Sequence, residues 1–194
     1  MVIPSRRQRP VNSPGFTLIE VLVAMVLIAI VASNIAALCT LAMRAVIGAR
    51  RQTSAATLAL QKMEQLMALT WATSGGPPGV SVSDLTSDIS VDPASASGTG
   101  LSPSPTNSLD NNVAGFVDYL DVSGAWVGSG ASPPASAVFV RRWRIDPLAS
   151  DPDNTLVLQV FVTTVEASSR SNQGRRIRQP GDAFLVDVKT RTAQ

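Results

Sequence analysis

One apolar segment, Phe16 to Met43, constrains the fold of this chain more than any other feature. Its only charged residue is Glu20, and it contains neither proline nor glycine. The uncharged stretch from Val21 to Met43 would be about 34 Å long as a helix, which is enough to cross the hydrocarbon core of a bilayer. We therefore predict a single transmembrane helix over residues 16–43.

The segment before this helix, residues 1–15, has the composition of a targeting leader, with three arginines, three prolines and no acid. An ordinary secretory signal fits poorly, because its apolar core is only about 7–15 residues long. A lipoprotein signal also fits poorly, because Cys39 follows Leu38, where a lipid-modified cysteine would need a small residue. We interpret Cys39 as a small apolar residue of the membrane helix.

Charge and residue usage exclude several classes of function. The chain has 16 Lys and Arg, 14 Asp and Glu and no histidine. Without the leader arginines the two signs nearly balance, so we do not expect nucleic acid as a partner. The lack of histidine removes the commonest general base and metal ligand, and a lone cysteine forms no intramolecular disulfide. We predict no enzyme activity, no cofactor and no metal centre.

Residues 44–73 continue the helix with a different pattern. Arg44, Arg50 and Arg51 mark the exit from the membrane, and apolar residues then recur at helical spacing. The predicted apolar stripe consists of Ala56, Ala59, Leu60, Met63, Leu66 and Met67. The polar residues Gln61, Lys62, Glu64 and Gln65 are predicted to lie off it. One helix from Phe16 to about Trp71 follows, whose second half needs a globular domain to cover one side.

The rest of the chain predicts a loop followed by a sheet. Residues 74–112 are rich in Ser, Pro, Gly and Asp and predict a long, exposed, partly disordered loop. Residues 113–194 predict an antiparallel sheet, with strands over 138–145, 156–165 and 183–188 and a weaker strand over 116–122. Within the first strand we predict a buried Trp143 whose neighbours Arg142 and Arg144 face water. The fold class is therefore α+β.

Two acidic segments and one basic cluster offer weaker signals. Asp110-Asn111-Asn112 and Asp151-Pro152-Asp153-Asn154 carry oxygen ligands for calcium, but neither has the spacing of a recognised calcium loop. We interpret both as solvated turns. The cluster of Arg175, Arg176 and Arg178, with Arg170 nearby, is interpreted as an exposed hairpin tip rather than as a site for DNA or an acidic partner.

The junction of leader and helix carries the decisive motif. Gly15 precedes Phe16, and Glu20 lies four residues further on inside the apolar segment. A carboxylate in lipid costs on the order of 2–3 kcal/mol and calls for a cationic partner. Cleavage after Gly15 would create one, because Phe16 would then carry an ammonium group.

The stretch Gly15 to Met25, GFTLIEVLVAM, resembles the class III signal of type IV prepilins and pseudopilins. The resemblance implies cleavage between Gly15 and Phe16 by a prepilin peptidase, which also N-methylates Phe16. It implies that Glu20 sets subunit register through a neighbouring Phe16 amine, and that the helices of residues 16–43 form a filament core. Other pilin subunits, inner-membrane lipid and an assembly platform are the implied partners.

The same resemblance implies a single-pass protein of the bacterial inner membrane whose C-terminal domain is extracytoplasmic before it enters a pilus or pseudopilus. No proline lies between Pro14 and Pro77 and there is one cysteine, unlike many major pilins. Residues 55–69 and the strand around Trp143 resemble PilV-type minor pilins and also the I-type pseudopilin of type II secretion. The long loop favours a minor pilin. The alternatives are the pseudopilin and an unprocessed, membrane-anchored binding module.

Overall fold

The computed structural model describes residues 15–72, 82–170 and 179–191 of the chain. These residues belong to two compact units, Met1–Ala45 and Val46–Gln194, which are treated separately below. The elements in chain order are α1 (Leu18–Ala68), β1 (Val117–Leu120), β2 (Trp126–Ser129), β3 (Phe139–Pro147), β4 (Thr155–Thr164), α2 (Val165–Arg170) and β5 (Ala183–Thr190).

The first unit contributes the N-terminal part of α1. Every described side chain from Gly15 to Ala45 is exposed, although nearly all of them are apolar. An 18-residue window of α1 near the N-terminus has a mean hydropathy of 2.7 and no buried residue, so by length and composition this helix is able to cross a membrane. The sequence prediction of a long helix beginning near Phe16 is confirmed, since α1 runs unbroken for 51 residues.

The second unit is built on a five-stranded antiparallel sheet in the order β2-β1-β3-β4-β5. The long central strands β3 and β4 pair along their whole length, with Trp143 opposite Val160, and Val160 in turn lies opposite Leu185 of β5. All four predicted strands are present. Strand β2 and the short helix α2 were not predicted, because each is too brief to show a clear period.

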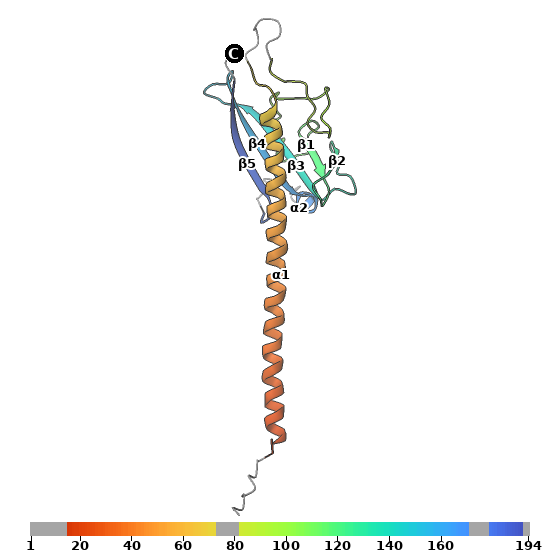
Figure 1. Ribbon diagram of the computed structural model, residues 1–194, viewed down its shortest axis with the longest axis vertical. Coiled ribbons are helices and arrows are strands. Elements are labelled where there is room, and N and C mark those ends of the chain that lie inside the picture. Colours follow the sequence, from red (N-terminus) through yellow and green to blue (C-terminus); the bar gives the residue numbers. More distant parts are fainter. Residues whose placement is uncertain (1–14, 73–81, 171–178, 192–194) are drawn as a thin grey trace, which may run out of the picture. The chain divides into compact units, whose positions relative to one another are not determined.

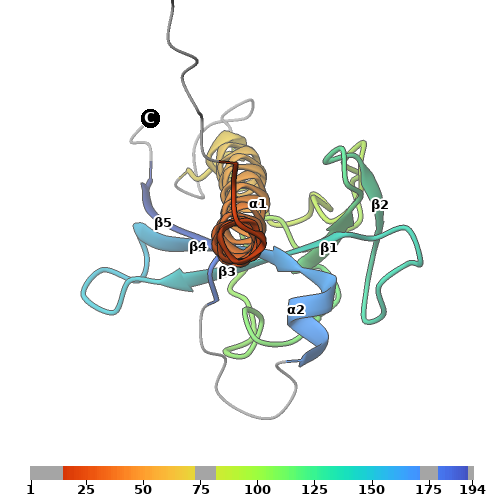
Figure 2. The same ribbon diagram turned by 90° about the horizontal axis from the view of Figure 1, so that it is seen from below.

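The C-terminal part of α1 covers one face of this sheet, and α2 lies on the other (Figures 1 and 2). Alternation along β4 directs one set of side chains, Leu156, Leu158, Val160 and Val162, into the core beneath α1. Trp143 is completely buried at its centre, as predicted. The predicted α+β architecture, a long N-terminal helix packed on a C-terminal antiparallel sheet, is therefore confirmed.

The face of α1 that meets the sheet differs from the predicted stripe. Ala56 is exposed and Leu60 and Met67 are 52% and 39% exposed, whereas Lys62, which we placed off the stripe, is 1% exposed. The buried residues of α1 are Ala55, Leu58, Ala59, Lys62, Met63 and Leu66. The prediction was right for Ala59, Met63 and Leu66 and wrong for the rest, because it counted apolar residues only, whereas the sheet holds a lysine at the middle of the contact face.

The end of α1 is fixed by the last strand. The Lys189 ammonium of β5 donates a hydrogen bond to the Met67 carbonyl at 2.6 Å. That carbonyl is one of the last four of the helix, which have no partner within the helix itself. Just beyond, the Trp71 indole donates to the Asn154 carbonyl at 3.2 Å, and the Arg191 guanidinium lies 4.5 Å from the Trp71 ring centroid. A cation contributed by β5 thus replaces the basic last turn that α1 lacks.

The predicted exposed loop is only partly exposed. Its residues 74–81 lie outside the described part of the chain, and residues 82–112 form no regular element there apart from one isolated bridge, Asp88 to Ser95. However, Ile89 and Leu101 are at most 2% exposed and join the core. Gly100 has a φ of +48°, and a Cβ at this position would lie 2.4 Å from the Asp84 carbonyl oxygen. The Ser-, Pro- and Gly-rich composition predicted the irregular backbone but not its anchoring by two apolar residues.

The prediction that both neighbours of Trp143 face water was wrong for Arg142, which is 3% exposed. Its guanidinium donates to the Asn112 side-chain oxygen at 2.9 and 2.6 Å and to the Ser168 hydroxyl at 2.7 Å. The contact with Ser168 joins β3 to α2, on the face of the sheet opposite α1. Arg144 is only half-buried and pairs with Asp146 at 2.7 Å.

Candidate processing and assembly site

The predicted cleavage junction lies outside helix α1. Gly15, Phe16 and Thr17 precede the first helical residue, so the Gly15–Phe16 peptide bond is not held in helical hydrogen bonds. Phe16 is 84% exposed, and no atom lies within 4 Å of a Cβ built on Gly15. The junction is therefore open to a peptidase, and nothing in the described fold itself requires glycine at this position.

Thr17 begins the helix and positions Glu20. The Thr17 carbonyl accepts hydrogen bonds from the Glu20 N–H at 3.1 Å and the Val21 N–H at 3.3 Å, and its hydroxyl accepts a longer one from Glu20 at 3.4 Å. A threonine at the helix cap with a glutamate three residues later is the capping-box spacing. Our sequence analysis missed this signal, which locates the helix start and places Glu20 in the first turn, where the helix dipole favours an anion.

Glu20 forms no ion pair with any residue in the described ranges 15–72, 82–170 and 179–191. It is also the only charged residue of the described helix before Arg44. A carboxylate surrounded by apolar side chains is stable in lipid only when a cation neutralises it. The arrangement therefore leaves the charge of Glu20 to be met by a group that the described chain does not supply.

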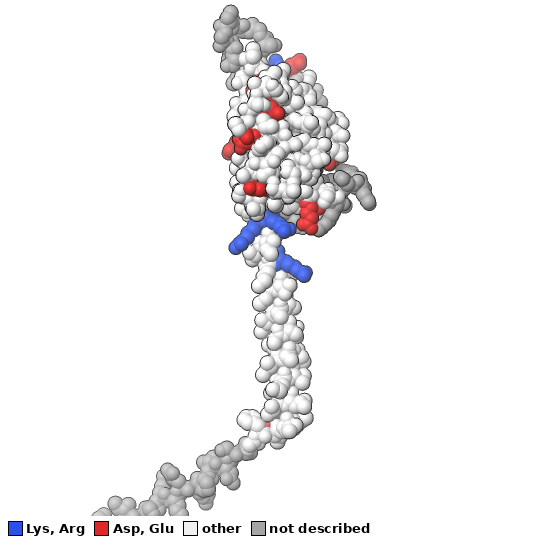
Figure 3. Space-filling view, turned by 90° about the vertical axis from the view of Figure 1, so that its right-hand side faces the viewer, with Lys and Arg blue, Asp and Glu red and all other residues white. Residues whose placement is uncertain are grey.

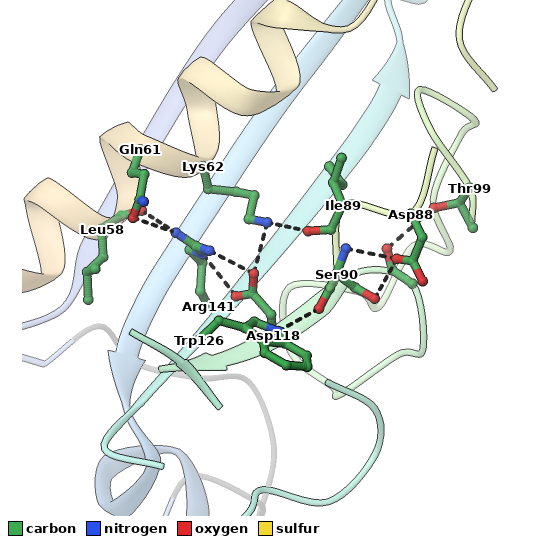
Figure 4. Close-up of polar contacts among 11 residues, drawn as sticks. Leu58, Gln61, Lys62, Asp88, Ile89, Ser90, Thr99, Asp118, Trp126 and Arg141 are labelled. Carbon is green, nitrogen blue, oxygen red and sulfur yellow. Dashed lines mark hydrogen bonds and ion pairs between the residues drawn. The ribbon is translucent and has the colours of Figure 1, made fainter. Parts of the chain in front are cut away.

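A second polar feature lies inside the second unit, Val46–Gln194, which we call the head, and was not predicted. The Asp118 carboxylate of β1 accepts hydrogen bonds from the Arg141 guanidinium of β3 at 2.9 and 2.8 Å, and its Oδ2 lies 2.8 Å from the Lys62 ammonium of α1 (Figure 4). Arg141 also donates to the Leu58 carbonyl, and Lys62 to the Ile89 carbonyl at 2.6 Å. We call Lys62, Asp118 and Arg141 the buried charge cluster; it connects α1, β1, β3 and the loop before β1.

The buried charge cluster carries two cations and one carboxylate. Burial lowers the pKa of Lys62 from 10.5 to about 8; the nearby Asp118 charge opposes this shift, and the Arg141 charge adds to it. The Lys62 ammonium also lies 4.4 Å from the Trp143 ring centroid, which gives it a favourable cation–π contact. The helical spacing of Ala55, Ala59, Lys62 and Leu66 could have revealed this buried lysine, but no local pattern indicates its partners on distant strands.

The weaker candidate sites do not come together as a binding site. Asn112 is occupied by Arg142, and the Asp151 carboxylate accepts hydrogen bonds from Asn154 and Thr155 within its own turn. Among the described residues no group of three or more His, Cys, Asp or Glu side chains is placed to hold a metal ion. In the basic cluster, Arg175, Arg176, Arg178 and the side chain of Arg170 lie outside what the structure describes.

Comparison with known proteins gives one match. Residues 12–33 match the family model described as the prokaryotic N-terminal methylation motif. This range contains Gly15, Phe16 and Glu20 together with the first part of α1. No curated protein and no solved structure matches the chain.

Proposed function

We propose that this chain, which is type IV pilin-like by its prepilin-type methylation motif and long apolar N-terminal helix, is a structural minor subunit of a type IV pilus. A prepilin peptidase would cleave the precursor between Gly15 and Phe16 and methylate the new Phe16 amine. The observation that carries the proposal is the open Gly15–Phe16 junction directly before the apolar part of α1.

The physical argument for assembly starts from the exposed part of α1. Large apolar side chains such as Leu27, Ile28 and Leu38 are each more than half exposed. Burying such a side chain stabilises an association by about 1.5–3 kcal/mol, so this surface needs lipid or neighbouring helices. Lipid would satisfy it while the subunit is anchored, and the helices of other subunits would satisfy it in a filament.

Glu20 supplies the register in this proposal. Cleavage would convert the Phe16 amide nitrogen into an ammonium group and so offer Glu20 a cation from its own or a neighbouring subunit, whereas no cation among the described residues pairs with it. A paired carboxylate is far more stable than an unpaired one in apolar surroundings. A neighbouring helix that places its Phe16 amine next to Glu20 is therefore favoured over the same helix shifted by a turn.

Mass spectrometry of the chain recovered from bacterial membranes tests the proposed processing. The expected N-terminal peptide begins at Phe16 and carries one added methyl group, and the precursor accumulates when the peptidase is deleted. A chain that keeps residues 1–15 in the presence of the peptidase would instead support an unprocessed membrane-anchored module.

The choice between pilus and secretion system needs a separate measurement. A minor pilin is expected in filaments sheared from the cell surface, and its deletion should lower filament number without affecting secreted enzymes. Loss of enzyme secretion with normal surface filaments would identify a pseudopilin. The irregular segment 82–112, which is larger than a tight connection between helix and sheet requires, favours the pilus.

A further inference from the structure

A hollow of about 570 Å³ lies at the end of the head where α1 enters it. Its apolar wall includes Val122, Val138 and Val165, and the first two are 79% and 37% exposed. Arg50 and Arg51 of α1 line the same hollow. A hollow of this size is in the range that holds small organic groups, and its lining combines an apolar wall with two cations.

These two arginines are unusual among the basic residues of the head. From Val46 onwards, Arg50 and Arg51 are the only Lys or Arg side chains in the described part of the chain that are largely exposed. The others are buried, as in the charge cluster, or partly covered, as Arg144 is. On the face in Figure 3, acidic side chains are spread over the head, while most of the basic ones lie where the helix leaves it and one more lies at the opposite end. Glu166 also lines the hollow, so its lining has two positive charges and one negative.

Few residues separate the hollow from the predicted membrane span along the chain. Arg50 follows Met43, the last residue of that span, by seven residues, which cover about 10 Å of chain when helical. The headgroup layer on each side of a bilayer is roughly 5–8 Å thick. A long arginine side chain directs its charge towards that layer while its methylenes lie on apolar surface. Arg50 and Arg51 are thus within reach of lipid phosphates while the subunit is anchored.

We infer that this hollow docks the head on anionic phospholipid, with the lipid phosphate at Arg50 and Arg51 and the lipid carbon atoms nearest to the headgroup against Val122 and Val138. The inference rests on the proposed membrane anchoring and adds a resting position for the subunit before assembly. A basic residue near an anionic membrane surface raises the equilibrium constant for binding to that surface about fivefold. Two such residues would therefore raise the docked-to-free ratio of the head about 30-fold on an anionic bilayer relative to a zwitterionic one. Assembly would then have to release the head from lipid.

Fluorescence quenching in lipid nanodiscs tests the inference with the full chain. Cys39→Ala removes the native thiol, and Val122→Cys then carries a single fluorophore at the hollow. Quenching by a nitroxide on the lipid headgroup is expected in discs containing phosphatidylglycerol and is expected to fall at high salt, where screening is strong. Arg50→Gln with Arg51→Gln should lower the docked-to-free ratio about 30-fold. Arg144→Gln, which removes a charge elsewhere on the sheet, should leave it unchanged.

A fluorophore at Ala149→Cys serves as the positional control, because Ala149 is exposed in the turn after β3, near the Asn154–Trp71 contact at the opposite end of the sheet. It should not be quenched in any disc. Equal quenching at Val122→Cys in zwitterionic and anionic discs would overturn the inference, as would quenching that persists without the two arginines. Quenching that depends on two chains per disc would identify a second copy as the occupant instead. Failure of the chain to enter discs at all would contradict the anchoring itself.

Discussion

Gly15 and Asp118 have different roles: Gly15 belongs to the proposed cleavage junction, and Asp118 belongs to the buried charge cluster of the head. No atom of the described chain lies near a side chain built at Gly15, so a substitution there changes what an enzyme encounters and leaves the fold alone. Asp118, in contrast, is 1% exposed and pairs with two buried cations, so a substitution there acts on the fold. Single substitutions therefore separate processing from stability.

We predict that Gly15→Leu blocks maturation and that Gly15→Ala is processed poorly, because a prepilin peptidase site should require a small residue before the cleaved bond. The precursor is fifteen residues longer than the mature chain, which a gel resolves. Gly48→Leu is the matched control, because Gly48 also has no atom near its Cβ position but is distant from the junction along the chain. Normal maturation of Gly15→Leu would show that the peptidase does not require a small residue at this position.

We predict that Asp118→Ala destabilises the head by about 3–5 kcal/mol, because it leaves the Lys62 and Arg141 charges buried without a carboxylate. Asp146→Ala is the control: its pair with Arg144 is 27–28% exposed and should contribute no more than about 1 kcal/mol. Urea unfolding of chains truncated to residues 46–194 measures both. Similar losses for the two variants would mean that the buried charge cluster is solvated in solution.

At the scale of elements, α1 is one helix with two different environments. Its first part has no covered face, whereas its last part has a strip of small and apolar residues against the sheet, interrupted by Lys62. A tightly packed helix–sheet contact centred on a lysine is stable because β1 supplies Asp118 and the loop before β1 supplies the Ile89 carbonyl, while Arg141 of β3 pairs with Asp118 and donates to the Leu58 carbonyl. Three segments distant in the sequence thus define the orientation of the helix.

The need for contacts between distant segments explains which features could be predicted from the sequence and which could not. The helix and the four strands depend on local composition and period, which a single sequence displays. The junction at Gly15, Phe16 and Glu20 follows from the resemblance of a short motif and stays a prediction. The rotation of α1, the burial of Arg142 and the anchoring of Ile89 depend on partners that the chain brings together only on folding. Strand β2 was missed because its four residues contain glycine and serine, which weaken any alternation.

We predict that the chain beginning at Val46 is soluble and contains both helix and sheet, whereas the full chain is extracted only in detergent. The reason is the change along α1 from an apolar surface on all sides to one on a single side. Fractionation with and without detergent, followed by circular dichroism, makes the comparison. If the truncated chain still needs detergent, the part of α1 that is apolar on all sides extends beyond Ala45 and our boundary is wrong.

We predict that Lys62 makes the stability of the head depend on pH above 8. The folded-state pKa of about 8 lies below the unfolded value of 10.5, so the unfolded chain binds more protons between these values. The free energy of unfolding should therefore rise with pH in this window, by about 2 kcal/mol at pH 9.5 relative to pH 7.5. Below pH 8 both states hold the proton and the contribution is constant.

Lys62→Met provides the reference for this pH dependence, because it keeps a side chain of similar length without a charge. The difference in unfolding free energy between wild type and Lys62→Met, measured in urea at pH 7.5 and 9.5, isolates Lys62 from other titrating groups. A difference that does not change with pH would show that the Lys62 ammonium stays protonated throughout the window.

At the scale of the whole molecule, the proposed function gives the apolar helix two successive partners. We propose that lipid covers residues 16–43 in the anchored state and that neighbouring subunits cover them in a filament. The proposed cleavage would remove the leader arginines and leave Lys and Arg nearly balanced by Asp and Glu in the mature chain. Within the part of the chain that remains, the proposed cleavage would change one group, the Phe16 amide nitrogen, which would become an ammonium.

The fraction of processed chain in sheared filaments, compared between wild type and Glu20→Val, tests this account most directly. No cation among the described residues pairs with Glu20 before cleavage, so we expect Glu20→Val to be processed normally. After cleavage this variant would lack the carboxylate that pairs with the Phe16 ammonium, so it should remain in the membrane. Glu20→Asp, which shortens the side chain by one methylene, should fall between. Equal incorporation of Glu20→Val and wild type would contradict the charge pair, and an uncleaved Glu20→Val would show that the glutamate serves the peptidase instead.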